Sequence, residues 1–265
     1  MSSKISPLSY GAFVTKNATT FKIHAPRSRR VHLVIFNSPE DETSVEHGMT
    51  KQDNGDFTIE LVDAGVETIY GFRLEGPLND PNLIIADPYS KAAITQNSMR
   101  HVAKSLVVDD TYDWEDDTWI QIDPRDLIIY EMHVRDMTTH PTSTANQKGT
   151  YLGLVEAGQN SGIEHLKSMG VNAVQILPIQ DFANFEVPFK DHKAHLYNDW
   201  NPYGRNHWGY MTTFFFAPES YYASDGTDAP GTWNGKDGKA VNEIKDMVKA
   251  FHKAGIAVIM DVVYN

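Results

Sequence analysis

The chain has 265 residues, enough for one large domain or two modest ones, and 41% of them are hydrophobic, which excludes wholesale disorder. Its 23 lysines and arginines against 35 aspartates and glutamates give a formal charge of −12, so nucleic acid and anionic membranes, which carry the same sign, are excluded as main partners. The absence of cysteine excludes disulfides, thiolate metal sites and cysteine nucleophiles.

The first residues, 1–8, lack the apolar core of a signal peptide. The longest apolar stretch, residues 255–263, is far too short to span a bilayer and is interrupted by Asp261. We therefore expect a cytoplasmic protein with no membrane partner.

The N-terminal part alternates apolar and polar residues, which is typical of half-buried strands. Four such segments are separated by polar turns, among them the turn at 53–56: residues 20–26, 30–36, 57–61 and 68–74. The pattern predicts a small antiparallel β-sandwich of immunoglobulin-like type over residues 1–108.

An acidic connector is predicted over residues 109–126. Its carboxylates are interpreted as a solvated surface, and Trp114 and Trp119 are expected to hold it against the rest of the protein.

The remaining segment, residues 127–265, follows a strand–helix–strand pattern. Two helices, each ended by a glycine, precede nearly continuous apolar strands, as in parallel sheets covered by helices. The predicted strands and helices are, in order, 127–134, 162–169, 171–179, 240–254 and 256–263. This order indicates either a (β/α) barrel or a doubly wound sheet.

Residues 182–233 contain six Phe, five Tyr and three Trp among Asn, Asp, Gly, Pro and His, which predicts a long functional loop. Flat rings beside hydrogen-bonding groups suit sugars, whose C–H faces stack on rings while their hydroxyls need polar partners. Trp208 and Tyr210 are candidate ligand contacts, whereas residues 214–216 (Phe-Phe-Phe) are interpreted as core.

Asp261 stands inside an apolar strand, where an unpaired carboxylate would be costly, so a cationic or hydrogen-bonding partner is expected. In a barrel, residues near the carboxyl end of a strand face the active site. A structural ion pair remote from the chemistry is the alternative.

Several segments resemble, in the same order, the α-amylase clan, glycoside hydrolase family 13, and its debranching enzymes: isoamylase, type I pullulanase and bacterial glycogen debranching enzyme. The segments are 70–77 and 86–91, similar to a family-48 carbohydrate-binding module; 127–138 and 165–182, similar to the first two barrel strands; 206–212, similar to the Trp-Gly-Tyr loop; and 261–265, similar to the first conserved region at the third strand.

The resemblance implies the first three βα units of a (β/α)8 barrel, incomplete here because a whole barrel takes about 250 residues. It implies a retaining hydrolase of α-1,6 branch linkages in glycogen, starch or pullulan, with the nucleophile and general acid beyond Asn265. The chain alone is then expected to be inactive, and the missing C-terminal part of the barrel is a possible partner.

The resemblance also implies roles for single residues. Asp261 would order the active site by pairing with an arginine near the nucleophile, and Tyr210 would stack on the glucose at the cleaved bond, with Trp208 and Asn265 as further substrate contacts. Asn265 ligates calcium in some α-amylases, but debranching relatives often lack that site, so no cofactor or metal is expected.

Two other functions remain open: a non-catalytic glucan-binding or interaction protein, and an α-1,4-acting amylase or branching enzyme. Because no tryptophan precedes Trp114, the N-terminal module is expected to pack on the barrel rather than to bind glucan, although Tyr10, Tyr70 and Tyr89 could replace the missing rings.

Overall fold

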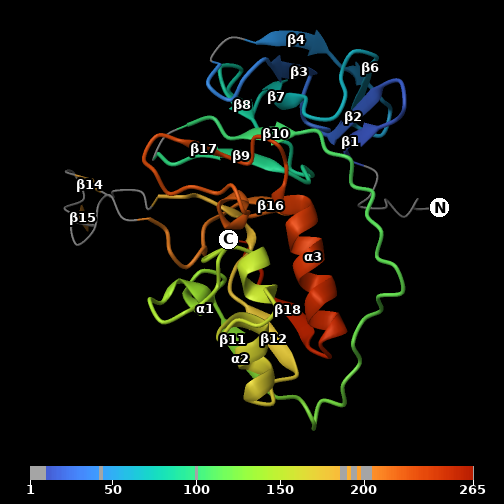
Figure 1. Cartoon of the computed structure of the whole chain (residues 1–265). Coiled ribbons are helices and arrows are strands. Elements are labelled where there is room, and N and C mark those ends of the chain that lie inside the picture. The colour runs from blue at the N-terminus through green and yellow to red at the C-terminus, as the bar shows by residue number, and fades with distance from the viewer. Residues whose placement is uncertain are drawn as a thin grey trace.

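A computed structural model describes residues 10–41, 44–98, 101–185, 190–191, 196–197 and 205–264. A β-rich module lies at one end of the molecule, and a smaller sheet flanked by helices lies at the other (Figure 1). Among the described residues, no helix is both long and apolar enough to cross a membrane.

The N-terminal module is a pair of antiparallel sheets. One sheet has the order β1-β2-β6-β5, and the other has the order β17-β9-β10-β7-β3-β4, with β8 paired to β7 and with β17 (Trp233–Asn234) coming from the C-terminal half of the chain. The strands are β1 (Gly11–Val14), β2 (Thr19–His24), β3 (Arg30–Phe36), β4 (Val45–Gly48), β5 (Thr50–Lys51), β6 (Asp56–Leu61), β7 (Ile69–Glu75), β8 (Ile84–Ile85), β9 (Ala93–Gln96) and β10 (Lys104–Leu106).

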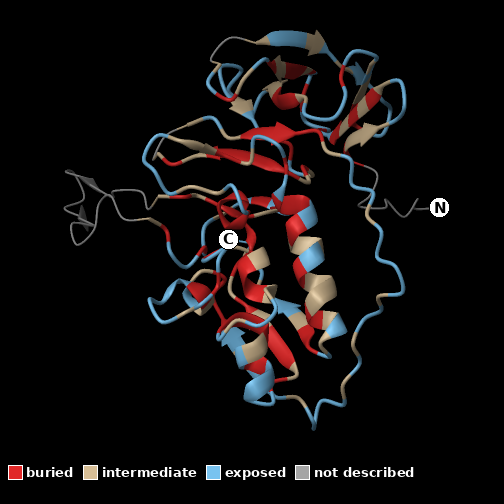
Figure 2. Ribbon diagram, viewed as in Figure 1, coloured by how far each residue is buried: buried red, intermediate tan, exposed pale blue. Residues whose placement is uncertain are grey.

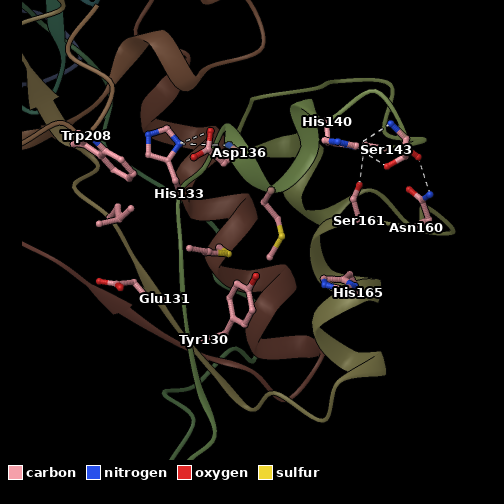
Figure 3. Close-up of a pocket in the computed structure, with 14 residues that line it drawn as sticks. Tyr130, Glu131, His133, Asp136, His140, Ser143, Asn160, Ser161, His165 and Trp208 are labelled. Atoms are coloured by element: carbon pink, nitrogen blue, oxygen red, sulfur yellow. Dashed lines mark hydrogen bonds and ion pairs between the residues drawn. The ribbon is translucent and has the colours of Figure 1, made fainter.

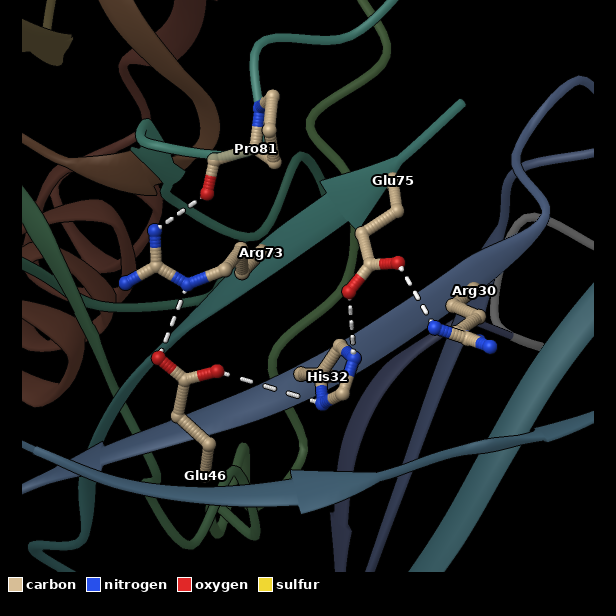
Figure 4. A network of polar contacts seen from close by, with 6 residues as sticks. All are labelled: Arg30, His32, Glu46, Arg73, Glu75 and Pro81. Atoms are coloured by element: carbon tan, nitrogen blue, oxygen red, sulfur yellow. Dashed lines mark hydrogen bonds and ion pairs between the residues drawn. The ribbon is translucent and has the colours of Figure 1, made fainter. Parts of the chain in front are cut away.

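The core of the sandwich is formed by the alternating residues that the sequence placed on one face of each strand. Phe21, Leu33, Phe57 and Phe72 are all buried there, and the Tyr70 ring meets Phe21 edge-on with centroids 4.9 Å apart. On the other face of β3, His32 lies between the carboxylates of Glu46 and Glu75, which also hold Arg73 and Arg30 (Figure 4). Apolar burial inside and charge pairing outside therefore fix the register of these strands.

The module does not end at its own strands. Strand β17 (Trp233–Asn234), from the C-terminal half of the chain, pairs antiparallel with β9 and extends the second sheet. The rings of Tyr89 and Phe216 also stack across the junction, with 5.6 Å between centroids and 7° between planes. These contacts agree with the expectation that the module packs on the barrel segment.

The acidic connector runs along helix α3 (Ala240–Lys253). Three ion pairs join them: Asp110–Lys245 at 2.8 Å, Glu115–Lys249 at 3.1 Å and Asp117–His252 at 2.8 Å. The expected solvated surface and tryptophan anchors were therefore wrong in part. Lys245, Lys249 and His252 of α3 hold the connector, while Trp119 is 74% exposed.

The barrel segment contains three parallel strands in the order β11-β12-β18. Its regular elements are β11 (Ile129–Met132), α1 (Asp136–Thr139), η2 (Leu152–Val155), α2 (Gly162–Ser168), β12 (Ala173–Ile176), α3 and β18 (Ala257–Met260). These observations confirm a β-sandwich followed by the start of a parallel barrel sheet. Each of the three parallel strands is shorter than predicted.

Only one face of this sheet is covered by helices. Val174 and Val258 pack with Leu166 of α2 and Phe251 of α3 in one apolar cluster, and Figure 2 shows the buried side of α3. On the other face Ile129 is 50% exposed. Because helices cover the outside of a (β/α) barrel, this exposed face corresponds to a barrel interior.

The aromatic segment is more regular than the predicted loop. It contains β13 (Gln180–Phe182), β14 (Lys190–Asp191), β15 (Leu196–Tyr197), β16 (Thr212–Pro218), η3 (Ser220–Tyr222) and β17. Phe214 is buried as predicted, but Phe215 and Phe216 are 36% and 56% exposed, so the prediction of a Phe214–Phe216 core was wrong for two of the three. Strand alternation turns Phe215 to the side opposite Phe214 but would leave Phe216 on the side of Phe214, and the pairing of β16 with β13 has register shifts.

Candidate functional site

Asp261 lies just after the carboxyl end of β18 rather than inside the strand. Its backbone N–H donates to the Ile176 carbonyl at 3.0 Å, which continues the parallel ladder by one bond. Its side chain is half-buried and accepts a hydrogen bond from the Tyr210 hydroxyl at 2.7 Å. The partner of this carboxylate is therefore a phenol, and none of the described lysines or arginines forms an ion pair with it.

Tyr210 reaches Asp261 because a tight turn precedes it. The Gly209 N–H donates to the Asn206 side-chain oxygen at 3.2 Å, and the Asn206 amide donates to the Ala183 carbonyl at 3.1 Å. Gly209 has φ +78°, and a Cβ there would lie 2.8 Å from the ring of Phe182. Only glycine fits this turn without strain and collision.

His133, at the end of β11, holds the same loop from the opposite side. This buried imidazole donates from Nε2 to the His207 carbonyl at 2.7 Å, and the Tyr222 hydroxyl lies 3.1 Å from the same nitrogen. The loop is thereby fastened at the ends of two barrel strands, through His133 just after β11 and through Asp261 just after β18.

The resulting site combines exposed rings with a carboxylate. Trp208 is 55% exposed and Tyr210 is 40% exposed. The hydrogen bond to Asp261, more than burial, raises the pKa of Tyr210 to about 12, so its hydroxyl remains a donor at physiological pH. Aromatic faces beside fixed polar groups are suited to sugar rings.

A cavity of about 460 Å³ adjoins this loop between β11, α1 and α2 (Figure 3). Trp208, His133, Asp136 and Glu131 lie toward one end, and His165 of α2 lies at the other. A cavity of this size is within the range of small-ligand sites.

Three of the four sequence-predicted site residues lie together in the structure. Tyr210 and Asp261 are in direct contact, and Trp208 lies on the same loop next to the cavity. Asn265 lies outside the described residues. His133 and His207 were missed, although both stand inside segments that carried the resemblance, and a histidine at a strand end was the available signal.

Sequence reasoning also missed two buried acids, Asp181 on β13 and Glu219 after β16. Both are fully buried, and burial is the main cause that raises both pKa values, that of Glu219 to about 7. The Glu219 carboxylate accepts backbone N–H groups of Phe182 and Tyr221 at 3.0 and 2.8 Å, and Asp181 accepts from Ser220. These acids fasten the β13–β16 pair behind the loop of residues 206–212, the Trp208 loop.

Comparison with known proteins shows which families this chain resembles. Residues 9–90 match the family model described as "Carbohydrate-binding module 48 (Isoamylase N-terminal domain)". The chain is 34% identical over 222 residues to isoamylase 1, chloroplastic, of Arabidopsis thaliana, covering 75% of this chain and 26% of that protein. It is 32% identical to a glycogen operon protein GlgX homolog of Haemophilus influenzae, covering 98% of this chain and 38% of that protein.

Solved structures agree. A pullulanase mutant from Paenibacillus barengoltzii, complexed with maltotetraose, superposes with a TM-score of 0.76 at 27% identity, covering 97% of this chain and 38% of that chain. The chain matches the N-terminal region of the debranching enzymes of glycoside hydrolase family 13. A pullulanase from Anoxybacillus sp. LM18-11, also complexed with maltotetraose, gives a TM-score of 0.74 at 30% identity, covering 99% of this chain and 35% of that chain. The chain thus spans about a quarter to two fifths of the length of these relatives.

Proposed function

We propose that this protein is a debranching hydrolase that cleaves α-1,6 linkages of glycogen, starch or pullulan with retention. The observation that carries the proposal is the Tyr210–Asp261 hydrogen bond at the carboxyl end of a parallel sheet, where barrel enzymes bind their substrates. The pullulanase neighbours, whose structures contain maltooligosaccharides, support an α-glucan as the ligand.

In this proposal Tyr210 stacks on a glucose ring, Trp208 borders the next sugar, and Asp261 orders the site. A retaining mechanism needs two carboxyl groups about 5 Å apart across the bond. Asp261 cannot supply both, so we propose that the nucleophile and general acid lie outside these 265 residues and that residues 1–265 alone are inactive. Asn265 as a substrate contact, the absence of a calcium requirement and a cytoplasmic location remain predictions.

Glucan binding by the 265-residue chain can be tested by titrating maltotetraose and following tryptophan fluorescence and NMR chemical shifts. Tyr210→Ala and Trp208→Ala should weaken binding by roughly tenfold each, the effect of losing about 1.4 kcal/mol of stacking. Trp119→Ala is the matched control, because this exposed ring lies on the connector. Equal affinities of all three variants would contradict the assignment.

Catalysis is tested with the product of the whole gene. Release of maltotriose from pullulan supports an α-1,6-acting enzyme, and hydrolysis of amylose alone supports the α-1,4-acting alternative. Binding without hydrolysis of either polymer supports a non-catalytic glucan-binding protein. Release of sugar from pullulan by the 265-residue chain itself would refute the proposed absence of the carboxylate pair.

A further inference from the structure

Three metal-ligating side chains converge beside the Trp208 loop. They are His133 at the end of β11, Asp136 at the start of α1 and His207 on the loop, and their ligand atoms all lie within 4.8 Å of one another. No other described residues form such a group. We propose that His133, Asp136 and His207 bind one first-row divalent cation, with Zn²⁺ as the best fit.

The spacing suits a tetrahedral ion. His207 Nε2 lies 3.1 Å from Asp136 Oδ2, and His133 Nδ1 lies 3.8 Å from Asp136 Oδ1. Zinc bonds of about 2.0–2.1 Å to nitrogen and oxygen place neighbouring ligand atoms about 3.4 Å apart. Asp136 needs only a small shift to match this spacing, whereas the His207 ring must rotate out of its stack on His133 before all three atoms can coordinate.

The hydrogen bonds of His133 leave the required lone pair on the required atom. Nε2 donates to the His207 carbonyl at 2.7 Å, so the proton is on Nε2 and the lone pair of Nδ1 faces Asp136. Nδ1 now accepts hydrogen bonds of 3.2 and 3.4 Å from the backbone N–H groups of Arg135 and Asp136, and a bound ion would replace them. A ring N–H donated to a backbone carbonyl is the usual arrangement around a metal-binding histidine.

The side chains of His207 and Asp136 can change conformation, and Asp136 supplies a negative charge. The side chains of His207 and Asp136 are 44% and 52% exposed, so the His207 ring, now stacked on His133 at 4.3 Å, is free to turn its Nε2 lone pair inward. Asp136 supplies the negative charge, and His133 and Asp136 line the 460 Å³ cavity, which leaves room for a water as fourth ligand (Figure 3). Two histidines, one carboxylate and a water form a zinc ligand set.

A bound ion would join β11 to the Trp208 loop by metal bonds in addition to the hydrogen bond from His133. The proposed site is not needed for the proposed glucan hydrolysis and can be tested without any sugar. Its alternative is a plain ion pair between Asp136 and His207 that closes the loop without a metal.

The test uses the 265-residue chain after dialysis against a chelator. Titration calorimetry with Zn²⁺ should show one equivalent bound, and Co²⁺ should give the visible absorption of a tetrahedral site. Asp136→Asn, which retains side-chain size, and His207→Asn should each weaken binding by about tenfold or more. Zn²⁺ should raise the Tm of the parent chain by more than the Tm of either variant.

Two controls separate this site from other histidines. His32→Asn removes an imidazole that lies between two carboxylates of the module, and a His192→Asn/His195→Asn variant removes the pair outside the described residues. Both should bind Zn²⁺ like the parent chain. No saturable equivalent in the parent, unchanged binding in Asp136→Asn and His207→Asn, or loss of binding in either control would overturn the assignment.

Discussion

The buried pair of Asp181 and Glu219 should make this protein less stable as the pH rises. Both carboxyl groups are fully buried, and the Asp181 oxygen Oδ1 has no hydrogen-bond partner among the described residues. Burial and the neighbouring Glu219 charge raise the pKa of Asp181, and burial raises that of Glu219 to about 7. The folded protein therefore keeps protons that the unfolded chain has already released.

The size and sign of this change in the free energy of unfolding follow from proton linkage. The difference between about 7 in the folded protein and 4.5, the ordinary value for Glu, corresponds to roughly 3 kcal/mol, at about 1.4 kcal/mol for each pKa unit. Because the folded state binds more protons in this interval, the Glu219 contribution to the free energy of unfolding falls between about pH 4.5 and 7. Other titrating groups add their own slopes, so the comparison must be between variants.

Asp181→Asn isolates the effect. The new amide oxygen can accept the Ser220 N–H and hydroxyl now bound by Oδ2, at 3.2 and 3.1 Å, while its NH₂ takes the place of the unpartnered Oδ1. Because the residue at position 181 no longer titrates, the variant lacks the raised pKa of Asp181 and should lose less stability than the parent between pH 5 and pH 8. Urea unfolding at both pH values measures the difference, with the exposed Asp237→Asn as control. Parallel pH profiles of Asp181→Asn and the parent would refute the reasoning.

Three further changes test the contacts that hold the parts together. Lys249→Ala removes an exposed ion pair, so it should lower the free energy of unfolding by less than about 1 kcal/mol, yet speed chymotryptic cleavage at Trp119 because the connector loses a contact with α3. Asn97→Ala removes a buried amide that donates to two backbone carbonyls of the barrel segment, at 2.7 and 3.1 Å. It should cost about 1–3 kcal/mol in urea unfolding, and an unchanged midpoint would contradict this. Gly235→Ala would place a Cβ 2.0 Å from the Ala93 carbonyl at φ +79°, so the variant should have a lower Tm than the parent. An equal Tm would show that the β17–β9 pairing does not constrain this position.

Periodicity predicted the elements whose burial repeats along the chain. Residues 30–36 form β3 with the predicted bounds, and the helix predicted at 240–254 is observed at Ala240–Lys253. The two-residue strand β17 was not predictable, because so short a segment has no period and pairs with β9 from far away in sequence. Phe215 and Phe216 failed for a related reason: composition indicates that rings are present, but the packing around β16, whose pairing with β13 has register shifts, decides which rings are buried.

The candidate site was likewise predictable from the sequence only in part. Asp261 could be selected from sequence because a carboxylate next to an apolar strand requires a partner. That partner, Tyr210, is 51 residues earlier and reaches it only through the turn at Gly209. The same loop is also held by His133, and no hydrophobic period in the sequence predicts the buried hydrogen bond from this side chain to the loop backbone. Because two barrel strands hold the loop at separate points, the ring of Tyr210 is positioned before any ligand arrives, and a sugar stacking there would not have to order the loop.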